Sequence, residues 1–151
     1  QEKIWQPAGM EQQATWLLSR TGKEISGCCV QAAPRDYARL GQFILEGAQV
    51  NGQSILPDGW LHQATHKQAD IGQPGRGYGY QWWTYDSGSF AARGIFGQGI
   101  FIDPARQLVI VSNGNWHKAG STGNPSFAAR EAFYQAVQKT LDDEAGTVPR
   151  R

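Results

Sequence analysis

The stretch that decides the fold is Arg93-Gly94-Ile95-Phe96-Gly97-Gln98-Gly99-Ile100-Phe101-Ile102-Asp103-Pro104-Ala105-Arg106-Gln107-Leu108-Val109-Ile110-Val111. The tetrapeptide Asp-Pro-Ala-Arg between its two apolar runs is typical of a turn that joins two strands. The second run does not alternate with polar residues, as expected for a strand that is covered on both faces. Glycines interrupt the first strand near Ile95–Gly97, and glycine inside a strand often marks a bulge or a close approach. The stretch predicts a hairpin with a glycine-broken first strand.

The rest of the chain supplies further strands and helices around this hairpin. Pro34 suits a first helical position and Gly47 suits a helix stop, while Asn124 is a good N-cap before Pro125. The expected elements are strands at Thr15–Leu18, Tyr78–Tyr85, Phe90–Ile102 and Leu108–Ser112, helices at Pro34–Glu46, near Trp60 and at Pro125–Asp143, and a glycine-rich loop at Gly72–Gly79. This order predicts an α+β fold, an antiparallel sheet covered by helices.

Composition narrows the class of protein. The 151 residues are enough for one domain with a sizeable core, and six Trp, five Tyr and six Phe provide surface to bury. Fourteen basic and thirteen acidic side chains give a net charge of +1, without the basic excess of a nucleic-acid-binding protein. No apolar run approaches the roughly 18 residues that span a bilayer. We therefore expect a folded domain with no nucleic-acid partner and no membrane span.

The beginning of the chain and its cysteines raise two further expectations. The chain begins at Gln1 and its only methionine is Met10, so we expect a removed leader or a piece of a longer polypeptide. Cys28 and Cys29 are adjacent, and neighbouring cysteines rarely bond to each other because closing so small a ring strains the peptide between them. No disulfide is expected.

Individual side chains carry weak chemical signals on their own. His62 and His66 are four residues apart but lack the Glu of the zinc-protease motif, so a solvated surface pair is the preferred interpretation and no metal is expected. In a strand, Trp82 and Trp83 face opposite sides, so one could line a cleft, although two packing residues explain the pair equally well. A bare N–H beside the glycine break in the strand could stabilise an oxyanion, but a bulged hairpin without function is as good an explanation.

Several short motifs follow one another along nearly the whole chain. They are Gln6-Pro7-Ala8-Gly9-Met10, Ala14-Thr15-Trp16, Gly27 through Ala32, Arg35-Asp36-Tyr37-Ala38-Arg39-Leu40-Gly41, Ile55-Leu56-Pro57, Gly77-Tyr78-Gly79-Tyr80-Gln81-Trp82-Trp83 and Gly94-Ile95-Phe96-Gly97-Gln98 through Asp103-Pro104. In this order the chain resembles the serine β-lactamase-like hydrolases, which include class C β-lactamases, penicillin-binding proteins, esterases and 6-aminohexanoate-dimer hydrolases. The resemblance is strongest to the esterase and 6-aminohexanoate-dimer branch.

The resemblance implies the C-terminal part of a β-lactamase/transpeptidase-like fold. That family attacks its substrate with the Ser of Ser-x-x-Lys, helped by the Tyr of Tyr-x-Asn. Neither motif occurs in residues 1–151, and in the family both precede the stretch that matches Gln6–Met10. Residues 1–151 are therefore expected to be a single domain or the C-terminal segment of a larger serine hydrolase domain.

The resemblance also implies a site. Ala92-Arg93-Gly94 falls at the family's Lys-Thr-Gly motif with only Gly94 retained, and the Ile95 N–H would be the second oxyanion-hole donor. The side chains expected near a small amide or ester substrate are those of Gln31, Trp82, Trp83, Arg93, Phe96 and Gln98. No cofactor and no metal are implied.

Two hypotheses of function follow. In the first, the chain is the C-terminal segment of an amide- or ester-cleaving serine hydrolase that works through an acyl-enzyme and is inactive alone. In the second, it is a non-catalytic module that binds a ligand or a protein through the aromatic strand 78–85. In the family, the strand matching Leu108–Val111 pairs with an N-terminal strand, so self-association or pairing with an N-terminal segment is expected.

Overall fold

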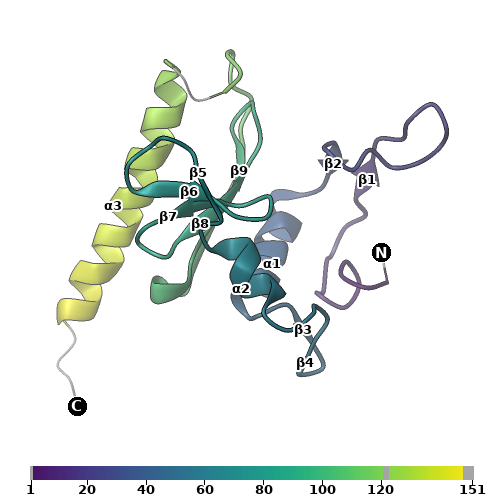
Figure 1. Ribbon diagram of the computed structural model, residues 1–151, viewed down its shortest axis with the longest axis horizontal. Helices are drawn as coiled ribbons and strands as arrows, with labels where there is room; N and C mark the ends of the chain where they lie inside the picture. The colour runs from purple at the N-terminus through teal and green to yellow at the C-terminus, as the bar shows by residue number, and fades with distance from the viewer. Residues whose placement is uncertain (1, 121–122, 148–151) are drawn as a thin grey trace.

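A computed structural model describes residues 2–120 and 123–147 of the chain (Figure 1). A six-stranded sheet forms the centre, with helix α1 on one face and helix α3 on the other. The elements are β1 (Thr15–Trp16), β2 (Val30–Gln31), α1 (Pro34–Leu45), β3 (Gln49–Val50), β4 (Gln53–Ser54), α2 (Trp60–Thr65), β5 (Ala69–Asp70), β6 (Arg76–Tyr78), β7 (Trp83–Tyr85), β8 (Phe90–Arg93), β9 (Gln98–Asp103), the short 3₁₀ helix η1 (Pro104–Arg106), β10 (Leu108–Asn113) and α3 (Pro125–Thr147). The α+β class predicted from the sequence is confirmed.

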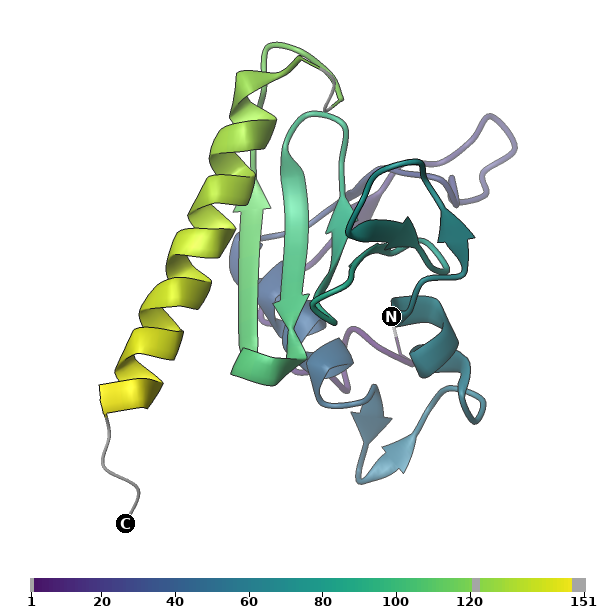
Figure 2. The same cartoon turned by 60° about the vertical axis from the view of Figure 1, so that its left-hand side comes forward.

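The sheet is antiparallel throughout, in the order β10-β9-β8-β7-β6-β5. The prediction of one glycine-broken strand over Phe90–Ile102 is wrong: β8 and β9 are separate antiparallel strands, and the glycines lie in the turn that joins them. The Asp-Pro turn leads into β10 as expected. Figure 2 shows the long strands β9 and β10 lying alongside α3. Strand β10 lies at the sheet edge and pairs only with β9 within the described residues.

Alternate side chains of these strands enter two cores. On the α1 face, Phe90, Ile100 and Ile102 are buried against partly buried residues that include Tyr37 and Val109. On the α3 face, the buried residues are Ala91, Phe101 and Tyr134. The rings of Phe101 and Tyr134 stack with centroids 4.4 Å apart. Strand β10 contributes to both cores, which explains its unbroken apolar sequence.

Helix α1 packs closely on the sheet because it presents a glycine at the contact. A Cβ at Gly41 would lie 2.5 Å from Cγ1 of Val109 and 2.9 Å from Cγ2 of Ile100. Gly47, with φ +87°, follows the helix end and takes the left-handed conformation that favours glycine. The boundary signals in the sequence therefore placed this helix within one residue.

Asp36 anchors the N-terminal segment to α1. Its carboxylate is buried and accepts hydrogen bonds from the Glu11 N–H at 2.8 Å and the Gln12 N–H at 3.0 Å, and from Arg39 Nη1 at 3.1 Å. The bond from the Glu11 backbone is the largest cause that lowers the pKa of Asp36 below its ordinary value of 3.8.

A test of this anchor follows from the direction of the pKa. Because the folded-state pKa is depressed, the stabilisation is present above pH 3.8 and is lost as the pH falls through the lower folded value. We expect the Glu11 and Gln12 amides to stay protected from hydrogen exchange at pH 3.8 and to lose protection only in more acidic solution. In Asp36→Asn this acid transition should disappear; its persistence would assign the anchor to another group.

Three further local predictions are wrong. Tyr78–Tyr85 is not one strand but the end of β6, a turn with Gln81 at φ +66°, and β7. The expected loop Gly72–Gly79 contains β6, which pairs with both β5 and β7. Helix α3 continues past Asp143 to Thr147. In the second case, sheet pairing overrides the low strand propensity of glycine.

The prediction that no disulfide forms is also wrong, because the structure joins Cys28 to Cys29. Cys29 takes φ +80°, and the peptide between the two cysteines is trans, as are all the described peptide bonds. The local backbone thus accommodates the small ring that the spacing argument disfavoured.

The arm, residues 13–31, extends away from the sheet (Figure 1). It carries the two-stranded β1–β2 pair, in which Thr15 lies opposite Gln31. Three consecutive apolar residues, Trp16, Leu17 and Leu18, are each about half exposed, with 47%, 55% and 52% of their surface accessible. Such a cluster is typical of a surface that packs against another part of a protein.

Candidate functional site

The candidate site is the turn Gly94–Gly97 between β8 and β9. Gly94 N–H donates to the Gln98 carbonyl at 2.8 Å, and Phe96 N–H donates to Gln98 Oε1 at 3.2 Å. Ile95 is 64% exposed. Its N–H has no hydrogen-bond partner in the part of the chain that the structure describes. The turn therefore leaves one backbone donor open beside the break in the strand.

Hydrogen bonds from the end of β10 and from the loop after it hold the carbonyl groups of this turn. The Ile95 carbonyl accepts from the Gly120 N–H at 2.7 Å, and the Phe96 carbonyl accepts from the Trp116 N–H at 2.9 Å. Ser112 Oγ donates to the Gly97 carbonyl at 2.9 Å. The Gly94 carbonyl, which shares a peptide with the Ile95 N–H, accepts from the Gly97 N–H at 3.3 Å. This bond, within a turn whose next three carbonyls are also bonded, holds the Ile95 N–H in one orientation, as a preorganised donor requires.

Gln31 is connected to the same end of the sheet through its neighbour Ala32. It lies on β2 and is exposed. The neighbouring Ala32 carbonyl accepts a long hydrogen bond, 3.5 Å, from Asn113 Nδ2. Asn113 ends β10 and is paired with Gln98 at the start of β9. Asn113 thus links the strand of Gln31 to the turn that holds Ile95.

The two tryptophans occupy opposite faces of the sheet. Trp82 lies in the β6–β7 turn and packs edge-to-face on Phe90 in the core on the α1 face, with centroids 5.1 Å apart. Trp83 begins β7 and contacts Tyr78 edge-to-face at 4.9 Å. The guanidinium of Arg93 lies 5.6 Å from the Trp83 ring centroid. Both indoles are half-buried packing residues in this arrangement.

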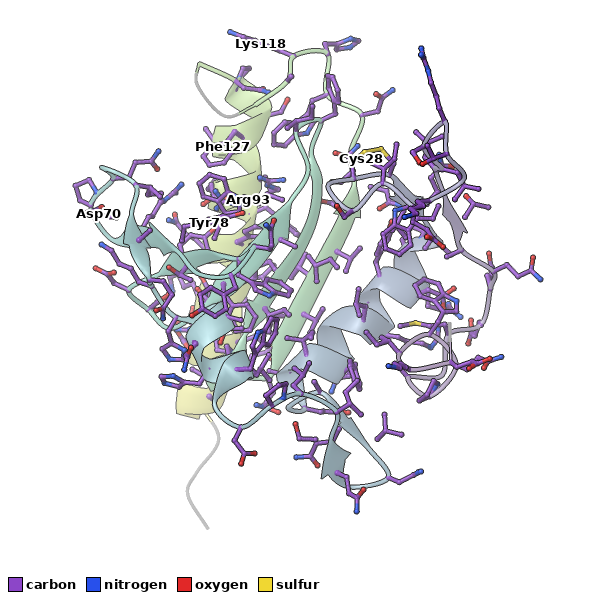
Figure 3. The ribbon with its side chains drawn as sticks, turned by 45° about the vertical axis from the view of Figure 1, so that its right-hand side comes forward. Cys28, Asp70, Tyr78, Arg93, Lys118 and Phe127 are labelled. Atoms are coloured by element: carbon purple, nitrogen blue, oxygen red, sulfur yellow. A yellow bond between two sulfur atoms is a disulfide. The ribbon has the colours of Figure 1, made fainter. Side chains whose placement is uncertain are left out.

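Arg93 belongs to a cluster between the sheet and α3, which we call the arginine cluster: Arg76, Arg93, Arg130, Glu131 and Tyr85. Its members come from β6, β7, β8 and α3, and Figure 3 shows Arg93 near Phe127 of that helix. Glu131 pairs with Arg76 at 2.9 Å and with Arg93 at 3.1 Å, and Tyr85 Oη donates to Glu131 Oε2 at 3.1 Å. Arg93 also donates to Tyr85 Oη.

Burial controls the ionisation of this cluster. Desolvation is the largest cause that raises the pKa of Tyr85 to about 12, so its hydroxyl stays protonated at neutral pH. Desolvation also lowers the pKa of the Arg130 guanidinium, which packs over Trp116 at 4.7 Å. The Nε atoms of Arg93 and Arg130 are buried without a hydrogen-bond partner. The carboxylate of Glu131 thus pairs with two guanidinium groups, and the side chain of Arg93 is held inside the fold.

The structure therefore divides the predicted site residues into groups. Gly94, Ile95, Phe96 and Gln98 form the turn, and Gln31 is tied to it through Asn113. Arg93 and Trp83 face α3, and Trp82 lies in the core on the α1 face.

Sequence reasoning missed Asn113, Trp116 and Gly120. Their only sequence signal was position, in the polar, glycine-containing loop that follows the last apolar strand.

Among the described residues, no three His, Cys, Asp or Glu side chains gather closely enough to hold a metal ion. His62 and His66 are both exposed, and their rings stack with centroids 3.8 Å apart. In residues 2–120 and 123–147, no helix combines the length and apolar character that crossing a bilayer requires.

In sequence and fold the chain is similar to 6-aminohexanoate-dimer hydrolases, which supports the resemblance to serine β-lactamase-like hydrolases that the order of motifs indicated. No protein-family model matches the chain. The chain is 27% identical over 124 residues to 6-aminohexanoate-dimer hydrolase of Paenarthrobacter ureafaciens, an alignment that covers 75% of this chain and 32% of that enzyme.

A solved structure shares the fold. It is a Bacillus anthracis protein proposed to be a 6-aminohexanoate-dimer hydrolase, with a TM-score of 0.70 and 27% identity. The match covers 99% of this chain and 38% of that protein. The chain thus spans about a third of the length of the relatives it matches, and it is similar to a segment of these proteins.

Proposed function

We propose that residues 1–151 are the C-terminal segment of a serine hydrolase that cleaves a small amide or ester through an acyl-enzyme. The Ile95 N–H would be one of the two oxyanion-hole donors, with Gln31, Phe96 and Gln98 near the substrate. An N-terminal segment would supply the nucleophilic Ser, its Lys and the Tyr. The observation that carries the proposal is the Ile95 N–H, which has no partner among the described residues and lies on a turn whose carbonyls are fixed.

Two surfaces support a place for the absent segment. Within residues 2–120 and 123–147, one edge of strand β10 is unpaired. An open groove near this strand is lined by Arg35, Ala38, Arg39 and Gln42 of α1 together with Gln107, Leu108 and Val109. The exposed apolar residues of the arm form the second surface. A strand added at β10 would extend the sheet by main-chain hydrogen bonds, as occurs in β-augmentation.

The binding-module alternative has less support. Of its aromatic residues Tyr78, Tyr80, Trp82, Trp83 and Tyr85, only Tyr80 is exposed, and the others pack on rings within the fold. Tyr80 forms a tilted pair with Trp60 at 6.1 Å, which is too small a surface to serve as a stable protein interface.

The proposal is tested with the complete reading frame that encodes the chain. We expect it to contain Ser-x-x-Lys and Tyr-x-Asn upstream and its product to hydrolyse p-nitrophenyl acetate. Ile95→Pro, which removes the backbone N–H, should lower kcat by about 10²–10³ while KM changes little. Ile95→Ala keeps the N–H and is the matched control. A reading frame without either motif, or equal kcat for both variants, would contradict the proposal.

For the isolated chain we expect no turnover of p-nitrophenyl acetate or of β-lactams. An oxyanion hole without a nucleophile gives only residual catalysis. The measurement is product release by absorbance, together with labelling by a fluorophosphonate probe. Stoichiometric acylation of one serine would show that this chain carries its own nucleophile.

We expect the isolated chain to associate, because an unblunted strand edge invites pairing with another chain. Leu108–Val111 contains neither a charged residue nor a proline. Sedimentation at micromolar concentration should show dimers or larger species, and Ile110→Lys, which adds charge to the edge strand, should reduce them. A monomer at all concentrations would contradict this expectation.

A further inference from the structure

The Cys28–Cys29 disulfide lies directly before the strand of Gln31, and the proposed chemistry makes no use of it. Cys28 is exposed and Cys29 is half-buried, so a thiol in solution can approach the bond from the side of Cys28. Figure 3 shows the bond in yellow beside the label of Cys28. The next two residues, Val30 and Gln31, form β2.

Both cysteines are tied by their backbone to the rest of the arm. The Cys28 carbonyl accepts from the indole Nε1–H of Trp16 at 3.0 Å, and the Cys29 carbonyl accepts from the Leu17 N–H at 3.2 Å. Ile25 N–H donates to the Leu17 carbonyl at 3.1 Å, and the Ile25 carbonyl accepts from Trp16 Nε1–H at 2.9 Å. The disulfide ring is therefore the junction at which both sides of the arm meet.

The backbone of Cys29 needs support in this position. Its φ of +80° lies in the left-handed region, where the Cβ of an L-residue crowds the following carbonyl. The ring formed by the disulfide restrains Cys29 covalently. On the other side, the Val30 carbonyl is held by Tyr37 Oη at 2.6 Å. If Cys29 relaxes to a negative φ, the backbone around it must rotate. Because the Val30 carbonyl is held in place, this rotation must disturb the hydrogen bonds of the arm.

We propose that Cys28–Cys29 is a redox-responsive site whose reduction by a dithiol releases the arm and the strand of Gln31. The dithiol's thiolate attacks Cys28 Sγ, the protein's S–S bond breaks, and Cys29 leaves as a thiolate that takes up a proton. The second thiol of the reagent then closes its own disulfide and frees the Cys28 thiol. One dithiol is oxidised and one protein disulfide is reduced. The release rests on contacts of this chain alone; only its consequence for the substrate rests on the proposed function.

Hydrogen exchange of the chain before and after treatment with dithiothreitol tests the proposal. Thiol titration should count no thiols before treatment and both cysteines after it. We expect the Leu17 and Ile25 amides to exchange about tenfold faster in the reduced chain, while α1 and β8–β10 keep their protection. No readout involves hydrolysis, so failure of the proposed function would leave these results unchanged.

Two double variants separate the backbone effect from the bond itself. Cys28→Ala/Cys29→Ala should exchange rapidly in the arm with or without the reductant. Cys28→Ala/Cys29→Gly should remain protected without a disulfide, because glycine takes positive φ readily. Unchanged exchange on full reduction, free thiols in the untreated chain, or equally fast exchange in the two variants would each overturn the proposal.

Discussion

Replacing Glu131 with alanine is expected to lower the free energy of unfolding by about 3–5 kcal/mol, because breaking a buried ion pair leaves its partner charges uncompensated. Glu131 is the carboxylate partner of both Arg76 and Arg93, and its side chain is only 12% exposed. The variant also removes the acceptor of the Tyr85 hydroxyl. Urea unfolding followed by tryptophan fluorescence gives the change directly.

Two further variants make the Glu131 result specific. Glu131→Gln keeps the size and one acceptor but not the charge, so its loss should fall between wild type and alanine. Asp143→Ala removes an exposed pair with Lys139 on the same helix, and should cost about 0.3–0.5 kcal/mol. If Glu131→Ala cost no more than Asp143→Ala, the arginine cluster would not depend on this carboxylate.

Gly97→Ala is the second large effect, expected to cost about 2–5 kcal/mol and to displace the turn that carries Ile95. Gly97 takes φ +93°, and a Cβ there would overlap the indole of Trp116. Gly97→Ala therefore introduces both backbone strain and overpacking at the same residue. The measurements are urea unfolding and the amide chemical shift of Ile95.

Gly88→Ala is the matched control for this substitution. Gly88 has a similar φ of +85°, but a Cβ there would meet nothing within 4 Å. It should therefore show only the backbone effect, about 1–2 kcal/mol. Equal losses for the two variants would show that contact with Trp116 adds nothing to the rigidity of the turn.

The elements predicted well from sequence are those with local signals. Asn124 accepts from the Ser126 N–H at 3.0 Å, as its N-cap position indicated, and α1 begins at Pro34. The β9–β10 hairpin followed from two apolar runs joined by an Asp-Pro turn. In these places the short-range chemistry of the chain and its packing favour the same structure.

The structural features that the sequence did not predict have a common physical cause. Gln81 turns the chain through positive φ without being glycine, so nothing local separated β6 from β7. Similarly, Asn113 contacts the carbonyl of Ala32 across eighty-one residues of sequence. The orientation of Arg93 toward Glu131 depends on which face α3 covers. Such placements are decided by tertiary contacts, which no window of sequence contains.

The order of the strands bears on how the chain finds its fold. From β5 to β10, each strand pairs with the one that follows it in the chain. The sheet can therefore form through a succession of short hairpins, with little loss of loop entropy, and structures built from such near-neighbour contacts fold fast. The long separation lies between α1 and the strands β9 and β10 that it covers. The larger entropic barrier therefore opposes the packing of α1 against a sheet that can already have assembled.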